Sequence, residues 1–149
     1  MTASDRPGVP VRMLDVGLLL IRALPGVVFV YHGSQKVFGA FGGPGIEGFA
    51  GWLASMEVPM PTANAWAAAL AEFGGGLSLL LGLGVRVMGV PLTITMLVAA
   101  FMVHGKAFSA QNNGMEYPLT LAFIAAGLAL TGAGRLSLDH LLFGRRRKA

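Results

Sequence analysis

The residues best able to do chemistry in this 149-residue chain interrupt or close its first apolar run. Arg22 falls roughly half a bilayer deep in a run that begins near Leu14, if a span takes about 20 residues. A cation there is costly unless it meets an anion or a wet cavity, so it indicates a functional site. His32 and Lys36 lie four residues apart and share one helical face. We expect that end of the helix to form the mouth of a site.

Glu72 is the anion that could match Arg22, because it lies near the middle of a later apolar run. If the two runs form antiparallel helices, Glu72 and Arg22 reach a similar depth, and a buried ion pair is the simplest way for either charge to exist in hydrocarbon. Such a pair has two possible roles. It could serve simply to fix the register of the two helices, or it could act as a proton relay, with the Glu72 carboxylate accepting protons beside a redox ligand.

Composition indicates what class of protein contains these residues. Hydrophobic residues make up 54% of the chain and charged residues 12%, whereas a soluble domain carries about 25% charged residues. This predicts an all-α integral membrane protein, a four-helix bundle forming a single transmembrane domain, since each span takes roughly 20 residues. Cysteine is absent, which excludes disulfides, thiolate-held clusters and cysteine nucleophiles within the chain.

The apolar runs predict four spans, at about residues 14–34, 63–83, 86–104 and 116–133. The segment at about 45–57 repeats apolar side chains at helical spacing around Trp52 but is too short to span, so it predicts a short interfacial amphipathic helix. That helix either lies flat on the bilayer or covers the outer end of the first helix. Residues 136–149 predict a basic cytoplasmic tail.

Basic residues predict the orientation, because they flank membrane helices on the cytoplasmic side. We therefore expect a multi-pass protein of the plasma (inner) membrane with both termini cytoplasmic. The basic tail should attract anionic membrane lipid rather than nucleic acid, since it follows an apolar helix. The cations that carry this prediction are Arg6, Arg12, Arg86, Arg135, Arg145, Arg146, Arg147 and Lys148.

Several short motifs occur in a recognisable order along the chain. They are Leu-Leu-Leu-Ile-Arg at 18–22, Tyr-His-Gly-Ser-Gln-Lys at 31–36, Gly-Phe-Ala-Gly-Trp-Leu at 48–53, Ala-Glu-Phe-Gly-Gly-Gly at 71–76, Gly-Leu-Gly-Val-Arg at 82–86, Val-His-Gly-Lys at 103–106, Glu-Tyr-Pro-Leu at 116–119 and Gly-Ala-Gly-Arg-Leu-Ser-Leu-Asp at 132–139. Over nearly its whole length the chain resembles the DoxX family of small bacterial and archaeal membrane proteins.

The resemblance implies a four-helix membrane protein linked to respiratory or redox complexes. The family is similar to a small subunit of archaeal quinol oxidase and thiosulfate:quinone oxidoreductase, and to a mycobacterial membrane partner of superoxide dismutase and a sulfurtransferase. Carried onto this chain, the matching polar positions are Arg22, His32, Lys36, Glu72, Arg86, His104, Glu116 and Tyr117.

Two functions of different classes follow. In the first, a substrate-binding set at the outer interface hydrogen-bonds a quinone headgroup or another small redox substrate, with Arg22 and Glu72 below it as a proton relay, so that the chain serves a quinone-linked oxidoreductase. In the second, the chain is a non-catalytic membrane anchor or scaffold for a protein partner of a redox complex. The substrate-binding set comprises His32, Lys36, His104, Glu116 and Tyr117.

Two histidines could also ligate haem iron or a metal ion. The sequence favours neither haem nor metal ligation, because it holds no helical Glu-x-x-His motif and no cysteine. Histidine at a membrane interface is more often a residue whose hydrogen bonds are made within the protein. No catalytic residue is assigned, and oligomer formation is left open.

Overall fold

The computed structural model describes residues 11–143, and its regular elements in that part of the chain are all helical. This confirms the all-α prediction. The polar N-terminal segment with Arg6, and the cations from Arg145 to Lys148, lie outside the described residues. The elements are α1 (Val11–Phe38), η2 (Ala40–Gly42), α2 (Gly45–Ser55), α3 (Pro61–Leu81), α4 (Val85–Val98), the π-helical η3 (Ala99–Val103), η4 (Ala110–Asn112), α5 (Glu116–Thr131) and α6 (Leu138–Phe143).

Two stretches of helix in the described part of the chain are long and apolar enough to cross a membrane. They are Met13–Phe38, which is most of α1, and Val85–Val103, which joins α4 to η3. Large apolar side chains such as Leu24, Val87 and Leu130 are exposed on the outer faces of the long helices. Exposed apolar surface of this kind is typical of helices that face lipid.

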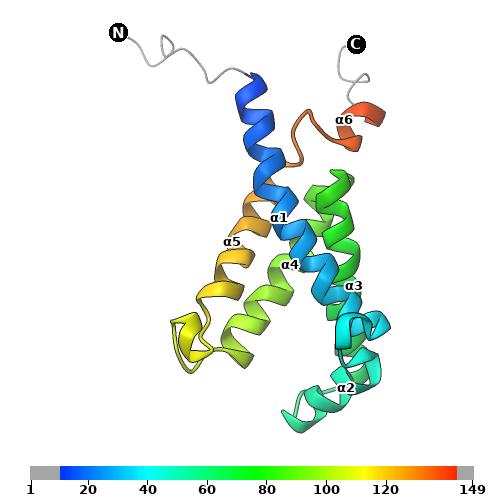
Figure 1. Cartoon of the computed structure of the whole chain (residues 1–149), viewed down its shortest axis with the longest axis vertical. Coiled ribbons are helices and arrows are strands. Elements are labelled where there is room, and N and C mark those ends of the chain that lie inside the picture. The colour runs from blue at the N-terminus through cyan, green and yellow to red at the C-terminus, as the bar shows by residue number, and fades with distance from the viewer. Residues whose placement is uncertain (1–10, 144–149) are drawn as a thin grey trace.

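The four long helices form two pairs, as Figure 1 shows. α1 packs against α3, α4 packs against α5, and contacts between α3 and α4 join the pairs. At the end where α1 begins, the pairs lie close together. At the other end they diverge, with the end of α1, α2 and the start of α3 in one leg and η3, η4 and the start of α5 in the other.

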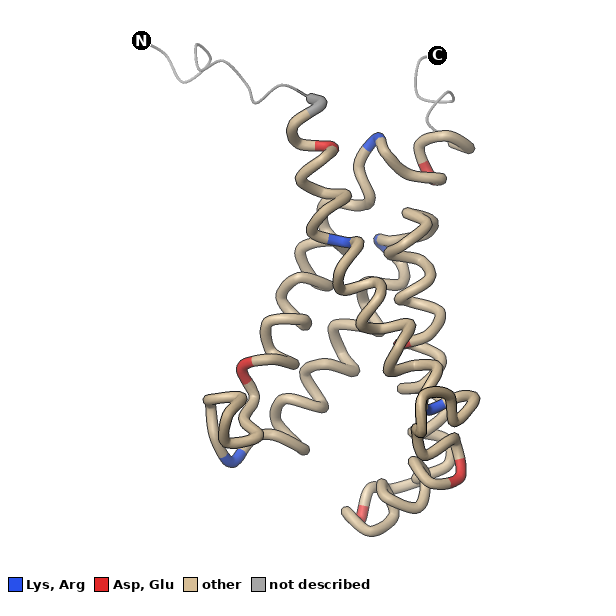
Figure 2. The backbone as a smooth tube through the Cα atoms, in the orientation of Figure 1, with Lys and Arg blue, Asp and Glu red and all other residues tan. Residues whose placement is uncertain are grey.

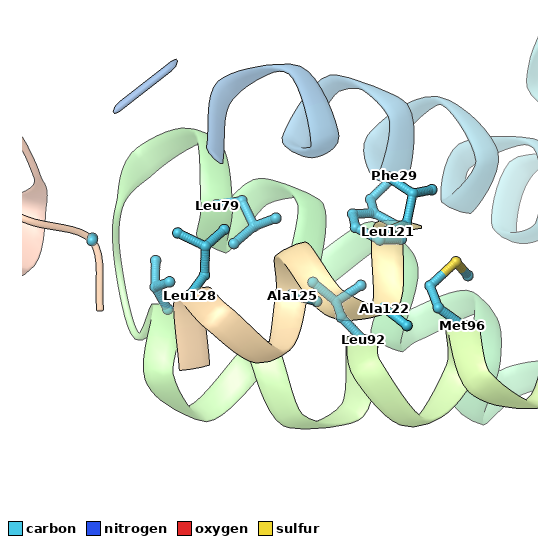
Figure 3. Packing of buried hydrophobic residues seen from close by; sticks show 10 residues of the cluster. Phe29, Leu79, Leu92, Met96, Leu121, Ala122, Ala125 and Leu128 are labelled. Atoms are coloured by element: carbon cyan, nitrogen blue, oxygen red, sulfur yellow. The ribbon is translucent and has the colours of Figure 1, made fainter. Parts of the chain in front are cut away.

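The hydrophobic core lies between the four long helices, as the close view in Figure 3 shows. Phe29 comes from α1, Leu79 from α3, Leu92 from α4 and Leu128 from α5, and all four are almost fully buried. Alanines on α5 fill the space between the larger side chains, which lets the helix axes come close.

α1 continues past residue 34, where the predicted span ends, to Phe38, so that His32 and Lys36 lie on one helix as expected. Pro25 and Gly33 lie inside α1 without ending it, and the helix stops before Gly39, whose φ of 67° is the left-handed conformation that commonly ends a helix. The extension carries Lys36 along the face of α3. The helix α2 falls within the segment predicted as 45–57, and its position in the membrane interface stays a prediction.

The contact between α1 and α3 depends on glycines that allow the backbones to touch. A methyl group at Gly33 would lie 2.6 Å from the Cα of Phe73, and one at Gly76 would lie 2.6 Å from the backbone nitrogen of Val30. Both distances are far below van der Waals contact, and neither backbone can move without separating the helices.

We therefore expect Gly33→Ala to reduce stability by about 1–3 kcal/mol, as for other overpacked sites. Gly17→Ala is the matched control, because the same change on the same helix meets nothing within 4 Å. Thermal unfolding of the purified protein in detergent measures both. Equal melting temperatures for the two variants would contradict the close approach of α1 and α3.

Candidate functional site

Lys36 and Glu72 form the one ion pair between side chains in residues 11–143. Lys36 lies near the end of α1 and donates a hydrogen bond from Nζ to Oε2 of Glu72, in the middle of α3. The Glu72 side chain is 5% exposed and the Lys36 side chain 19% exposed. The Glu72 side chain is therefore enclosed, while part of the Lys36 side chain is still exposed.

One aromatic side chain, Phe49, contacts this pair through Lys36. The Lys36 Nζ lies 5.4 Å from the ring centroid of Phe49 on α2, within the range of a cation–π contact, and Phe49 stacks on Trp52 at 5.8 Å. One turn back on α1, His32 packs edge-on against Tyr31, and its Nδ1 lies 3.1 Å from Oε1 of Gln35. We call His32, Lys36, Phe49 and Glu72 the α1–α3 site.

The α1–α3 site combines a hydrogen-bond donor, a proton-accepting group and an aromatic face. The Lys36 ammonium has three N–H donors and uses one on Glu72. The others can bind a ligand oxygen. The Glu72 carboxylate can exchange a proton with a ligand hydroxyl within reach, and the Phe49 ring offers a flat apolar surface. The arrangement suits a small planar ligand with oxygen acceptors.

The predicted pair between Arg22 and Glu72 is wrong as a contact. Arg22 is 2% exposed, and its guanidinium donates hydrogen bonds to three backbone carbonyls instead of to a carboxylate. The carbonyls belong to Leu79, Leu80 and Leu136.

The error lies in the depth assigned to each helix. Close contacts pair Gly33 with Phe73 and Gly26 with Leu80, so Arg22 lies level with the end of α3 and the turn at Gly82. Arg22 and Lys36 are separated by about 21 Å along α1 at 1.5 Å per residue. Glu72 therefore meets Lys36, and the helix-terminal carbonyls, which carry partial negative charge, accept from Arg22.

His104, Glu116 and Tyr117 belong to a second group, on the other leg of the molecule. Nδ1 of His104 lies 2.9 Å from the carbonyl oxygen of Asn113, and since that oxygen only accepts, Nδ1 carries the proton. A Glu116 carboxylate oxygen accepts from the backbone N–H of Ala110 at 2.9 Å. These bonds brace the loop between η3 and α5, and Tyr117 is exposed beside them.

The structure does not bring the five predicted substrate-binding residues into one site. His32 and Lys36 lie near the end of α1, and the other three lie where η3 and η4 meet α5, on the leg that Figure 1 shows diverging from α1 and α3. No hydrogen bond within residues 11–143 joins the two groups. This placement is compatible with the prediction that both groups lie at the same end of the bundle. Two groups at the same depth in a membrane can still lie apart from each other in the membrane plane.

Phe49 is the site residue that sequence reasoning missed. The sequence left open whether the apolar face of α2 lies on the bilayer or covers the outer end of the first helix, and it did not single out Phe49. The signal that could have found this residue is the Gly-rich segment before α2, since α2 packs back against α1 and α3. A hollow of about 430 Å³ lies elsewhere, on α5, and is lined by Leu119, Thr120, Phe123 and Ile124. Within residues 11–143 no three His, Asp or Glu side chains are grouped to hold a metal ion.

Comparisons with known proteins agree with a membrane role. The family model described as DoxX matches residues 17–105, a range that contains every member of the α1–α3 site and ends before Glu116. The chain is 33% identical over 132 residues to "Putative oxidoreductase CatD" of Bacillus subtilis, covering 89% of this chain and 91% of that protein. It is 33% identical over 135 residues to "Inner membrane protein YqjF" of Escherichia coli, covering 88% and 95%. No solved structure matches it significantly.

Proposed function

Because this chain belongs to the DoxX family of membrane proteins, we propose that it is a multi-pass inner-membrane subunit of a redox complex, and that it binds a quinone headgroup or another small redox substrate at the α1–α3 site. The observation that carries the proposal is the half-open Lys36–Glu72 pair against the Phe49 ring. One relative is named as an oxidoreductase and another as an inner-membrane protein, which agrees with a redox role in that membrane.

The proposed ligand matches the chemistry of the site part by part. A quinone presents two carbonyl oxygens on a flat ring, so Lys36 would donate to one oxygen while Phe49 packs against the ring. When a quinol is oxidised its hydroxyl protons need an acceptor, and Glu72 is the buried carboxylate beside Lys36. In this proposal the chain binds the ring and moves protons, and a partner oxidoreductase exchanges the electrons.

Titrating a short-chain quinone against the tryptophan fluorescence of the purified protein tests the proposal, since Trp52 stacks on Phe49. We expect saturable quenching. Lys36→Gln should weaken binding at least tenfold, because a hydrogen bond from a charged donor is worth about 1.5–3 kcal/mol. Lys106→Gln, which changes a lysine on the other leg, is the matched control and should leave binding unchanged.

A second function, that of a non-catalytic anchor or scaffold, is favoured by two observations. The predicted site residues lie on separate legs, and most of them already have partners within the chain. An anchor tolerates such separation. Absence of quenching in the wild type would favour the anchor, and quenching that depends on His104 but not on Lys36 would move the site to the other leg.

We also propose four spans with both termini cytoplasmic, because exposed Arg86 lies at the start of α4 and exposed Arg135 follows the end of α5. Exposed cations of this kind flank membrane helices on the cytoplasmic side. Figure 2 shows where the charged residues lie along the molecule. The absence of native cysteine makes single-cysteine labelling free of background. Ala110→Cys should react with a membrane-impermeant maleimide added to intact cells or spheroplasts, whereas Ala149→Cys should react only after the membrane is opened. The reverse pattern would contradict the orientation.

A further inference from the structure

The Lys36–Glu72 pair is open toward one end of the molecule. Lys36 lies near the end of α1 with its side chain 19% exposed, and the exposed His32 lies one turn before it. The Glu72 side chain, on α3, is 5% exposed. Of the other helices packed against α3, α2 carries one titratable side chain, the exposed Glu47, and α4 carries one, Arg86 at its start. The opening beside Lys36 is therefore where water can approach the Glu72 carboxylate.

Toward the other end of the molecule the interface between α1 and α3 is dry. Phe29 and Leu79 are 1% and 0% exposed and belong to the core that Figure 3 shows. A methyl group at Gly76 would lie 2.6 Å from a backbone nitrogen of α1, so the two helices leave no space there. The hydroxyl of Ser78 donates to a backbone carbonyl in the turn after α3. A chain of buried waters needs polar partners at every step, and this stretch of the described chain offers no free side chain as a partner.

Arg22 adds a fixed positive charge to this closed route. It lies about 21 Å from Lys36 along α1 at 1.5 Å per residue, and it is 2% exposed. Within residues 11–143 no carboxylate pairs with it, its Nε has no hydrogen-bond partner, and its charge meets only the partial charges of backbone carbonyls. A fixed arginine is an electrostatic barrier to protons in membrane pores. Packing and charge therefore both oppose proton movement from Glu72 toward the start of α1.

From these observations we propose that the Glu72 carboxylate exchanges protons with one side of the membrane only, the side at which α1 ends, through the opening beside Lys36. The inference rests on the proposed function for its ligand. Oxidation of a bound quinol to a quinone gives two electrons to the partner oxidoreductase and two protons, which pass one at a time to Glu72 and then to water beside Lys36. With both termini cytoplasmic, the chain releases these protons into the outer compartment.

The direct test follows a thiol placed at the carboxylate position, in the full chain reconstituted in liposomes with a uniform orientation. N-ethylmaleimide crosses membranes, so its rate of reaction with Glu72→Cys reports the thiolate fraction rather than the access of the reagent. Below the thiol pKa, we expect that rate to rise about tenfold for each pH unit by which the side where α1 ends is made more alkaline. The same pH step on the opposite side should leave the rate unchanged.

Two control variants identify the sides. Ala110→Cys lies in η4, on the side where α1 ends, and Leu141→Cys lies on α6, at the other end of the molecule; both positions are exposed. Each thiol should follow the pH of its own compartment. A rate for Glu72→Cys that follows the compartment of Leu141→Cys, or both compartments equally, would overturn the proposal.

The wild type provides a second measurement that needs no change at Glu72. A membrane-impermeant quaternary ammonium carbodiimide, added to one side at a time, joins Lys36 to Glu72 through an amide bond, and peptide mass spectrometry detects the loss of one water. We expect this bond only with the reagent on the side of Ala110. Its absence there, or its formation from the opposite side, would contradict the one-sided opening.

Neither measurement uses a quinone, so the two proposals can fail separately. One-sided proton exchange without any quinone binding would refute the proposed ligand and leave the sidedness of Glu72 in place. Quinone binding together with proton exchange from the other side, or from both sides, would refute the sidedness alone.

Discussion

Replacing Arg22 with Met is expected to lower the melting temperature in detergent by on the order of 10 °C. The guanidinium joins the end of α3 to the segment before α6 through three backbone carbonyls. Methionine keeps much of the apolar volume of the side chain but leaves these carbonyls without their donor, and a buried unsatisfied group costs about 1–3 kcal/mol. For a chain of this size each kcal/mol shifts the melting temperature by roughly 2–4 °C.

Two controls isolate the bridging role of Arg22. Arg86→Met removes an exposed arginine that makes a single hydrogen bond of 3.2 Å to the carbonyl of Thr131, so it should have a much smaller effect. Arg22→Lys keeps the charge but lacks the planar fork that reaches carbonyls on two segments, so it should recover only part of the loss. Equal melting temperatures for Arg22→Met and Arg86→Met would show that Arg22 does not hold these segments together.

The second large effect is expected from breaking the Lys36–Glu72 pair, and it should be asymmetric. Lys36→Met leaves the almost fully buried Glu72 carboxylate without a counter-charge, which costs about 3–5 kcal/mol in comparable buried pairs. Glu72→Leu should cost less, because the partly exposed Lys36 can extend its ammonium toward the headgroups. The double variant should be more stable than Lys36→Met alone.

A double-mutant cycle of thermal stability measures this coupling directly. An interaction term of more than about 1 kcal/mol in favour of the intact pair indicates that the two side chains stabilise each other. Strictly additive losses would contradict the ion pair. Crossing Glu72→Leu with Arg22→Met provides the comparison, because these residues do not touch and their effects should add.

Helix content could be predicted from composition and periodicity because both act locally. The apolar runs around Leu14 and Val87 predicted helices that the structure contains, and the Gly-rich segment after Val37 predicted the break before α2. The end of α1 was less predictable. The predicted span ends at residue 34, whereas the helix continues for four more residues, from Gln35 to Phe38, until Gly39 adopts its left-handed conformation.

The partners of the charged residues could not be predicted, because they depend on register and on lateral arrangement. The sequence placed Arg22 at the depth of Glu72, whereas in the structure Lys36 lies at that depth and is the partner of Glu72. The sequence also contains no rule for which helices pair, so it could not show that His32 and His104 belong to different legs. The acceptors for Arg22 are backbone carbonyls, which every residue has, so no pattern of side chains in the sequence could have indicated them.

The central claim, that the α1–α3 site holds a quinone-type ligand, is tested most directly by what the protein retains from its own membrane. The full chain is purified in mild detergent from native membrane, its absorption spectrum is recorded, and bound lipids are extracted and analysed for quinone. We predict quinone in the wild type and in Lys106→Gln, and its loss in Lys36→Gln. A haem absorption band, or equal quinone content in Lys36→Gln and wild type, would contradict the claim.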